Sequence, residues 1–162
     1  MMSRKYLVPA WLAVLLALAA VTPAFAAMPA HPALKLTTLD GRPWDLSAQR
    51  GHWVIVNFWA TWCVPCIKEM PDISAFVGKH AGVRAIGLAY DDSPVADIRA
   101  FLKKHPVDYP VAQVTLDKSP KDFDEPLGLP TTYLIAPDGT VAKRFIGPID
   151  GRALGAAIAA GK

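Results

Sequence analysis

The segment that most restricts the fold is residues 52–59, a nearly continuous run of β-branched and aromatic side chains. Such a run is typical of a strand that is buried on both faces of a sheet. It ends just before Cys63 and Cys66. From Pro65 onward, helical spacing places Ile67, Met70, Ile73, Phe76 and Val77 on one side, with Pro71 as an expected kink. We therefore expect the two cysteines to span a turn from a buried strand into a helix.

The rest of the chain alternates between strand and helix patterns. Residues 34–39 and 42–46 predict a hairpin around Asp40-Gly41, and 140–146 predicts the hairpin partner of a strand at 132–135. Further strands are expected at 83–90 and 109–116, and helices at 95–104, 119–127 (short and irregular) and 150–160, with Ser93-Pro94 as N-cap and N1 of the first. This order predicts an α/β fold with a mixed central sheet flanked by helices.

The N-terminus has the pattern of an export signal. Arg4 and Lys5 precede an apolar stretch that reaches Val21, and Ala24-Phe25-Ala26 is an Ala-x-Ala cleavage site. We expect residues 1–26 to be a signal peptide, 27–33 a tail, and 34–162 one domain in the periplasm. The alternative is an uncleaved anchor, although the run is short for a membrane span of about 20 residues.

Charge and cysteine count narrow the possible partners. The formal net charge is +3, and the leader supplies two of the positive charges, so no nucleic-acid partner is implied. The only two cysteines are three positions apart. A bridge across so short a gap stabilises a fold little, which favours chemistry over a structural role. We expect a monomer, since no surplus apolar stripe remains.

The Cys-x-x-Cys segment suits thiol-disulfide exchange. A cysteine in the first turn of a helix meets unpaired backbone N–H groups and the positive end of the helix dipole, which lower the pKa of its thiol. Cys63 has that position, and Cys66 lies on the same helix face and can resolve a mixed disulfide. No cofactor other than this redox-active pair is expected.

Residues 57–66 have the sequence Asn-Phe-Trp-Ala-Thr-Trp-Cys-Val-Pro-Cys, and Glu69-Met70-Pro71 follows. Further along the chain, residues 128–135 have the sequence Gly-Leu-Pro-Thr-Thr-Tyr-Leu-Ile, and Asp138-Gly139 comes after them. Together these segments resemble the TlpA/ResA-like branch of the thioredoxin superfamily, and the resemblance covers most of residues 34–162. It implies a thioredoxin-like fold with a cis Leu129–Pro130 bond that faces the cysteines. It also implies that the backbone of Leu129 pairs with an extended substrate segment.

Glu69 is a candidate proton shuttle. Its position, three residues after Cys66, places it near the disulfide side of the helix, and the resembling family has a glutamate there. The alternative is a solvated helix residue. Asn57 departs from the wider superfamily, which often has a buried Asp at this strand position, and an amide cannot accept the proton.

Trp62 and Pro65 are candidate substrate-binding residues. Trp62 can cover the core, or it can shield the disulfide and offer the substrate an apolar platform, and the two roles are compatible. Pro65 restrains the turn and starts the helix. A Val-Pro spacer resembles the reducing members of the superfamily more than the oxidising ones, whose potentials run from about −270 mV for thioredoxin to about −120 mV for DsbA.

These features predict a disulfide reductase that acts on exported proteins, such as apocytochromes c or copper-site assembly proteins. Because the chain shows no nicotinamide or flavin site, its electrons would come from a membrane thiol donor of the DsbD/CcdA type.

Several alternatives stay open. The same pair could work as a thiol oxidase or isomerase, or two thiolates could bind Cu(I) in a metallochaperone. His31, His52, His80 and His105 are scattered, without the spacing of a zinc site. An inert structural staple fits the helix-start position poorly. A peroxiredoxin is disfavoured because Val56 and Ala60 stand where that family has Pro and Thr.

Overall fold

The computed structural model describes residues 28–161; the expected signal peptide, 1–26, lies outside this range. The strands are β1 (Lys35–Thr37), β2 (Pro43–Asp45), β3 (Trp53–Trp59), β4 (Val83–Tyr90), β5 (Val111–Val114), β6 (Thr131–Ile135) and β7 (Val141–Ile146). The α-helices are α1 (Val64–Lys79), α2 (Val95–Lys104) and α3 (Gly151–Ala160), and short 3-10 helices cover Leu46–Gln49 and Leu116–Lys118. No helix in residues 28–161 is both long and apolar enough to cross a bilayer.

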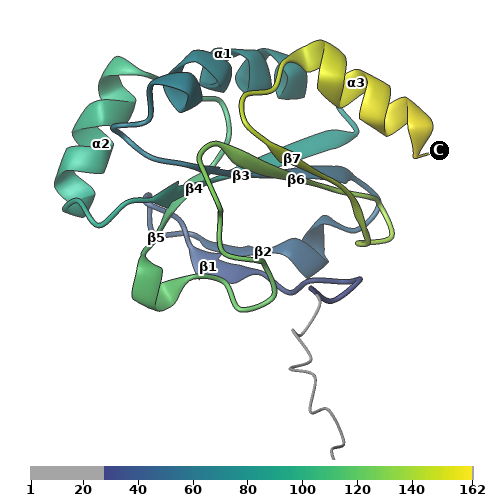
Figure 1. Cartoon of the computed structure of the whole chain (residues 1–162), viewed down its shortest axis with the longest axis horizontal. Coiled ribbons are helices and arrows are strands. Elements are labelled where there is room, and N and C mark those ends of the chain that lie inside the picture. Colours follow the sequence, from purple (N-terminus) through teal and green to yellow (C-terminus); the bar gives the residue numbers. More distant parts are fainter. Residues whose placement is uncertain (1–27, 162) are drawn as a thin grey trace, which may run out of the picture.

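Five strands form a mixed sheet in the order β5-β4-β3-β6-β7 (Figure 1). The strands β4, β3 and β5 run parallel, while β6 and β7 are antiparallel to their neighbours. All seven residues of β3, at the centre, are buried. The expected α/β fold with a mixed central sheet is confirmed. The prediction that residues 52–59 form a strand buried on both faces is confirmed by β3.

The two faces of the sheet have separate cores. Alternation along β3 directs Trp53, Ile55 and Trp59 to one face, where all three helices contribute apolar side chains. Val54 and Phe58 point to the other face, which the β1–β2 hairpin and the segment between β5 and β6 cover (Figure 1). The helices thus lie on the face that also carries the cysteines.

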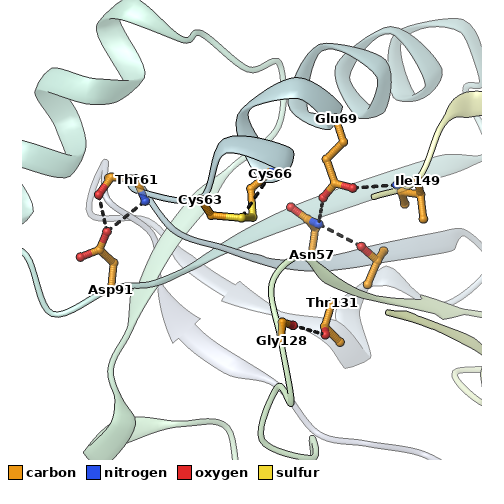
Figure 2. The surroundings of a disulfide bond; sticks show 10 residues. Asn57, Thr61, Cys63, Cys66, Glu69, Asp91, Gly128, Thr131 and Ile149 are labelled. Atoms are coloured by element: carbon orange, nitrogen blue, oxygen red, sulfur yellow. Dashed lines mark hydrogen bonds between the residues drawn. A yellow bond between two sulfur atoms is a disulfide. The ribbon is translucent and has the colours of Figure 1, made fainter. Parts of the chain in front are cut away.

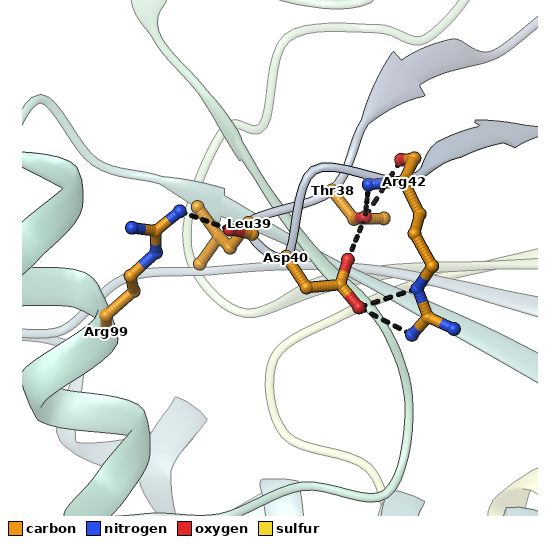
Figure 3. Close-up of polar contacts among 5 residues, drawn as sticks. All are labelled: Thr38, Leu39, Asp40, Arg42 and Arg99. Atoms are coloured by element: carbon orange, nitrogen blue, oxygen red, sulfur yellow. Dashed lines mark hydrogen bonds and ion pairs between the residues drawn. The ribbon is translucent and has the colours of Figure 1, made fainter.

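The hairpin is joined to the edge of the sheet and to α2. Its turn residue Gly41 has φ of +83°, a left-handed conformation that favours glycine. The Leu39 N–H donates to the Val111 carbonyl at 2.7 Å, and Arg99 of α2 donates to the Leu39 carbonyl (Figure 3). Asp40 pairs with Arg42 across the same turn. These contacts attach β1 and β2 to the rest of the domain.

Three expected elements differ from the structure. Residues 119–127 form no helix, and the only helical turn nearby is Leu116–Lys118. Pro126 lacks the N–H that a helix needs beyond its first turn. Instead Arg144 of β7 pairs with Asp124 in this loop at 2.9 Å.

The strand expected at 109–116 shortens to Val111–Val114, since Pro110 cannot donate to a ladder. Helix α2 begins at Val95 with Pro94, rather than Ser93, as the N-cap, and no side chain caps it. Pro71 lies inside α1 without ending it.

Candidate active site

Cys63 and Cys66 form a disulfide at the turn from β3 into α1 (Figure 2). The Cys63 N–H donates to the Ala60 carbonyl at 3.1 Å, which closes the turn. Cys63 is then the N-cap of α1, and its sulfur accepts the Cys66 N–H at 3.3 Å. Pro65 stands in the first turn of the helix, where a missing N–H costs nothing.

The two cysteines differ in exposure and in their position on the helix. Cys63 keeps 4% of its surface exposed, whereas Cys66 is fully buried. The N-terminus of a helix stabilises negative charge, so a reduced Cys63 is held where its thiolate is favoured. Of the two cysteines, Cys63 is therefore the one that keeps some accessible surface.

Glu69 lies on α1 one turn after Cys66 and is only 2% exposed, so it is not a solvated helix residue. Its carboxylate accepts two hydrogen bonds, one from the Asn57 side-chain amide and one from the Ile149 N–H, both at 2.8 Å (Figure 2). Burial raises the pKa of Glu69 to about 7 against the lowering effect of these bonds, and Asp72 adds to the rise. Both protonation states are then populated near neutral pH, as a proton shuttle requires.

Asn57 positions that carboxyl group from the middle of β3. Its amide nitrogen donates to Glu69 and also to the Thr132 hydroxyl of β6, at 2.9 Å.

Gly87 of β4 pairs with Asn57 in register, and a Cβ there would lie 3.0 Å from the Trp59 indole nitrogen. A side chain at position 87 would therefore crowd the indole ring.

The Leu129–Pro130 bond is cis, as the family resemblance implied. It directly precedes β6, whose first residue, Thr131, pairs with Phe58 near the end of β3. The proline therefore lies at the same end of the sheet as the disulfide. The Pro130 carbonyl accepts the Gly147 N–H at 2.9 Å.

Large apolar side chains are exposed around this end of the sheet. Trp62 is 69% exposed and Val64 59%, on either side of Cys63. Leu127, two residues before Leu129, is 87% exposed, and Ile146, which pairs with Thr131, is 62% exposed. Of the two interpretations of Trp62, coverage of the core is wrong; the indole is available at the surface.

Sequence analysis missed Asp91, the first residue after β4. Its buried carboxylate accepts both the N–H and the hydroxyl of Thr61, at 3.0 and 2.5 Å (Figure 2). The available signal was the run Asp91-Asp92-Ser93-Pro94 at the carboxyl end of a buried strand parallel to β3. Adjacent parallel strands end side by side, which brings this turn to the cysteines.

Three of the four histidines contact residues other than the two cysteines. His80 stacks on Phe76 and His105 on Phe101, each one turn earlier in its own helix. His52 lies beside Arg84. Within residues 28–161, no three His, Cys, Asp or Glu side chains gather as a metal site would require.

Comparisons with known proteins agree with this site. Residues 29–144 match the model of the AhpC/TSA family. The thiol-disulfide oxidoreductase ResA of Bacillus cereus is 38% identical over 120 residues, covering 72% of this chain and 67% of the relative. The ResA protein of Bacillus subtilis is 36% identical over 118 residues, covering 72% and 65%. A thiol:disulfide interchange protein from Chlorobium tepidum has a similar structure, with a TM-score of 0.70, 27% identity, and coverage of 85% of this chain and 98% of that one.

Proposed function

We propose that this chain, which belongs to the AhpC/TSA family and is a thiol-disulfide oxidoreductase of the ResA type, works as a disulfide reductase on exported proteins. The observation that carries the proposal is the position of the disulfide: Cys63, which keeps a small exposed surface, caps α1, and the buried carboxyl of Glu69 lies one turn beyond Cys66. A nucleophile, a resolving thiol and a proton acceptor are thereby arranged on one helix.

In the proposed cycle, the Cys63 thiolate attacks one sulfur of a substrate disulfide. The substrate's other sulfur leaves as a thiolate and takes up a proton, which produces a mixed disulfide. Glu69 accepts the proton of the Cys66 thiol, and the Cys66 thiolate then attacks the Cys63 sulfur. The second substrate thiol is released, Cys63–Cys66 is oxidised, and two electrons have moved to the substrate.

The substrate would bind at the apolar end of the sheet. The exposed indole of Trp62 and the Pro65 turn border Cys63 on one side. On the other side Leu129 would offer its backbone to an extended segment of the substrate, next to Pro130. Apocytochromes c and copper-site assembly proteins are the substrate classes that the TlpA/ResA-like resemblance suggests.

A reductase outside the cytosol needs a supply of electrons. The N-terminal pattern of residues 1–26 supports export to the periplasm, where disulfides persist. We therefore include a membrane thiol donor of the DsbD/CcdA type, which would return Cys63–Cys66 to the dithiol, and we propose that the protein acts as a monomer.

The test is the equilibrium of Cys63–Cys66 with glutathione buffers of known potential, together with the titration of the Cys63 thiolate in wild type and Glu69→Gln. A potential near or below about −270 mV, with an altered titration in the variant, supports a reductase that uses Glu69. A potential near about −120 mV contradicts the reductase and leaves a thiol oxidase or isomerase.

A further inference from the structure

A second buried carboxylate, that of Asp91, adjoins the active-site turn and has no role in the cycle above. Asp91 is 6% exposed. Figure 2 shows its carboxylate directed at Thr61, whose N–H and hydroxyl both donate to Oδ2. Thr61 is two residues before Cys63, a separation of at most about 7 Å of backbone. Asp91 thus contacts the turn that delivers the nucleophile.

The other side of Asp91 is anchored as well. Its Oδ1 accepts the Ser93 N–H at 2.9 Å. The side-chain amide of Gln113 on β5 donates to the carbonyls of Asp91 and Ser93, at 2.7 and 2.8 Å. The Gln113 bonds therefore hold the backbone of this loop, and the carboxylate cannot turn away from Thr61 without also breaking its bond to the Ser93 N–H.

All the groups that contact the carboxylate are donors, and this favours the ionised form. Burial acts to raise the pKa of Asp91, but the hydrogen bonds from Ser93 and Thr61 outweigh it, so the pKa lies below its ordinary value. None of the three ion pairs within residues 28–161 includes Asp91. A negative charge without a paired cation therefore lies near Cys63, in an interior that screens it less than water does.

We propose that Asp91 lowers the reduction potential of the Cys63–Cys66 pair, while its bonds to Thr61 hold the turn that presents Cys63. A nearby negative charge disfavours the Cys63 thiolate and so destabilises the reduced protein. A dithiol of lower stability is a stronger electron donor, the reverse of the situation in DsbA, whose reduced form is stabilised. The inference rests on the proposed reductase function and supplies a physical reason for its direction.

The test compares three variants in glutathione redox buffers. Asp91→Asn removes the charge with little change of shape. Asp92→Asn is the matched control, because it removes the same charge from the adjacent, exposed residue. Thr61→Val keeps the Asp91 charge and removes only the hydroxyl donor. Thermal unfolding of each oxidised variant reports whether the fold is retained.

We expect Asp91→Asn to shift the equilibrium about tenfold toward the dithiol, which equals about 30 mV for a two-electron couple. Asp92→Asn should remain within about twofold of wild type, because solvent screens an exposed charge. Thr61→Val should have a potential at or below that of wild type. If Asp91 had a purely structural role, the reduction potentials of Asp91→Asn and Thr61→Val should instead shift in the same direction.

An Asp91→Asn shift no larger than that of Asp92→Asn would overturn the inference, as would a shift toward the disulfide. If Asp91→Asn does not fold, Thr61→Val still decides, because a potential raised above wild type contradicts the charge effect. The wild-type potential is a separate result: a value near about −120 mV defeats the proposed reductase, whereas the Asp91 inference depends only on the difference between variants.

Discussion

The two faces of the central sheet take alternate residues of the same strand and use them differently. On the helical face, Asn57 bonds to Glu69 and Thr132 in a buried polar cluster next to the disulfide. On the opposite face its neighbour Phe58 is surrounded by aromatic rings at centroid distances of 6.0 to 6.3 Å, those of Tyr90, Phe123 and Tyr133. Successive side chains of a strand point to opposite faces, so one position separates the two environments.

The comparison shows how a small domain accommodates a polar active site in its interior. A buried carboxyl group costs free energy unless it is hydrogen-bonded, and here Asn57 and Ile149 provide the bonds. The aromatic cluster contains side chains that bury large apolar areas and form edge-to-face contacts. The helical face therefore carries the chemistry and the aromatic face mainly stabilises the fold. Substitutions on the two faces should therefore have different consequences for activity and for stability.

Replacing the nucleophile should abolish exchange and leave the fold intact. In Cys63→Ser the hydroxyl can still cap α1, but it cannot attack a disulfide at neutral pH. We expect disulfide reduction to fall by more than about 10³-fold, measured with an insulin reduction assay. The Cys66→Ser variant is the matched control, since it should retain the attack and accumulate a mixed disulfide. Reduction by Cys63→Ser at a rate near wild type would contradict the site.

Removing an aromatic ring from the opposite face should lower the stability of the fold and leave the redox equilibrium of the cysteine pair nearly unchanged. Phe58→Ala leaves a cavity in a fully buried site and should reduce the free energy of unfolding by about 3–5 kcal/mol. Urea denaturation of the oxidised protein measures this loss. At temperatures where the variant is folded, the glutathione equilibrium should stay within about twofold of wild type. A large change in potential would show that the two faces are not separable.

Glu69 should make stability depend on pH. Its pKa is raised from 4.5 to about 7 on folding, so the folded state binds the proton more tightly than the unfolded state. The wild-type protein should be most stable relative to Glu69→Gln below about pH 4.5. This advantage should decline as the pH rises to about 7, by about 3 kcal/mol in total.

Urea denaturation of wild type and Glu69→Gln at pH 4.5, 6 and 8 measures the difference. Asp72→Asn is the comparison variant: Asp72 is exposed on the same helix and makes the smallest of the contributions to the Glu69 pKa, so this variant should keep most of the wild-type pH profile. Parallel pH profiles for wild type and Glu69→Gln would show that the carboxyl group does not titrate in this range. The prediction would then have to be abandoned.

Trp62 should have the smallest effect on stability. Its side chain is 69% exposed, so Trp62→Ser should change the free energy of unfolding by no more than about 0.5 kcal/mol. The rate with a protein disulfide should fall several-fold while the rate with glutathione disulfide changes less, because only the larger substrate would contact the indole. Equal losses with both substrates would argue against the platform role.

Much of the architecture could be predicted from local patterns. The continuous apolar run of β3, the helical spacing after Pro65 and the Asp40-Gly41 turn each reflect periodicity or turn chemistry over a few residues, and all were confirmed. The errors were local as well: residues 119–127 contain two prolines, and their conformation depends on tertiary contacts such as Arg144 to Asp124. This segment is mostly polar, and its few apolar residues have no periodicity that would indicate a helix or a strand.

The reactive pair, its place at the start of a helix, and the candidacy of Glu69 could all be predicted from the sequence, because all three depend on spacing within one helical segment. The surroundings of these residues could not be predicted, because they depend on contacts between distant parts of the chain. Ile149 is 80 positions from the Glu69 that it bonds, and Asp91 is 30 positions from Thr61. Such contacts arise from strand order and register, which bring the ends of β3, β4 and β7 to the same end of the sheet. There, burial raises the pKa of Glu69, whereas hydrogen bonds lower the pKa of Asp91.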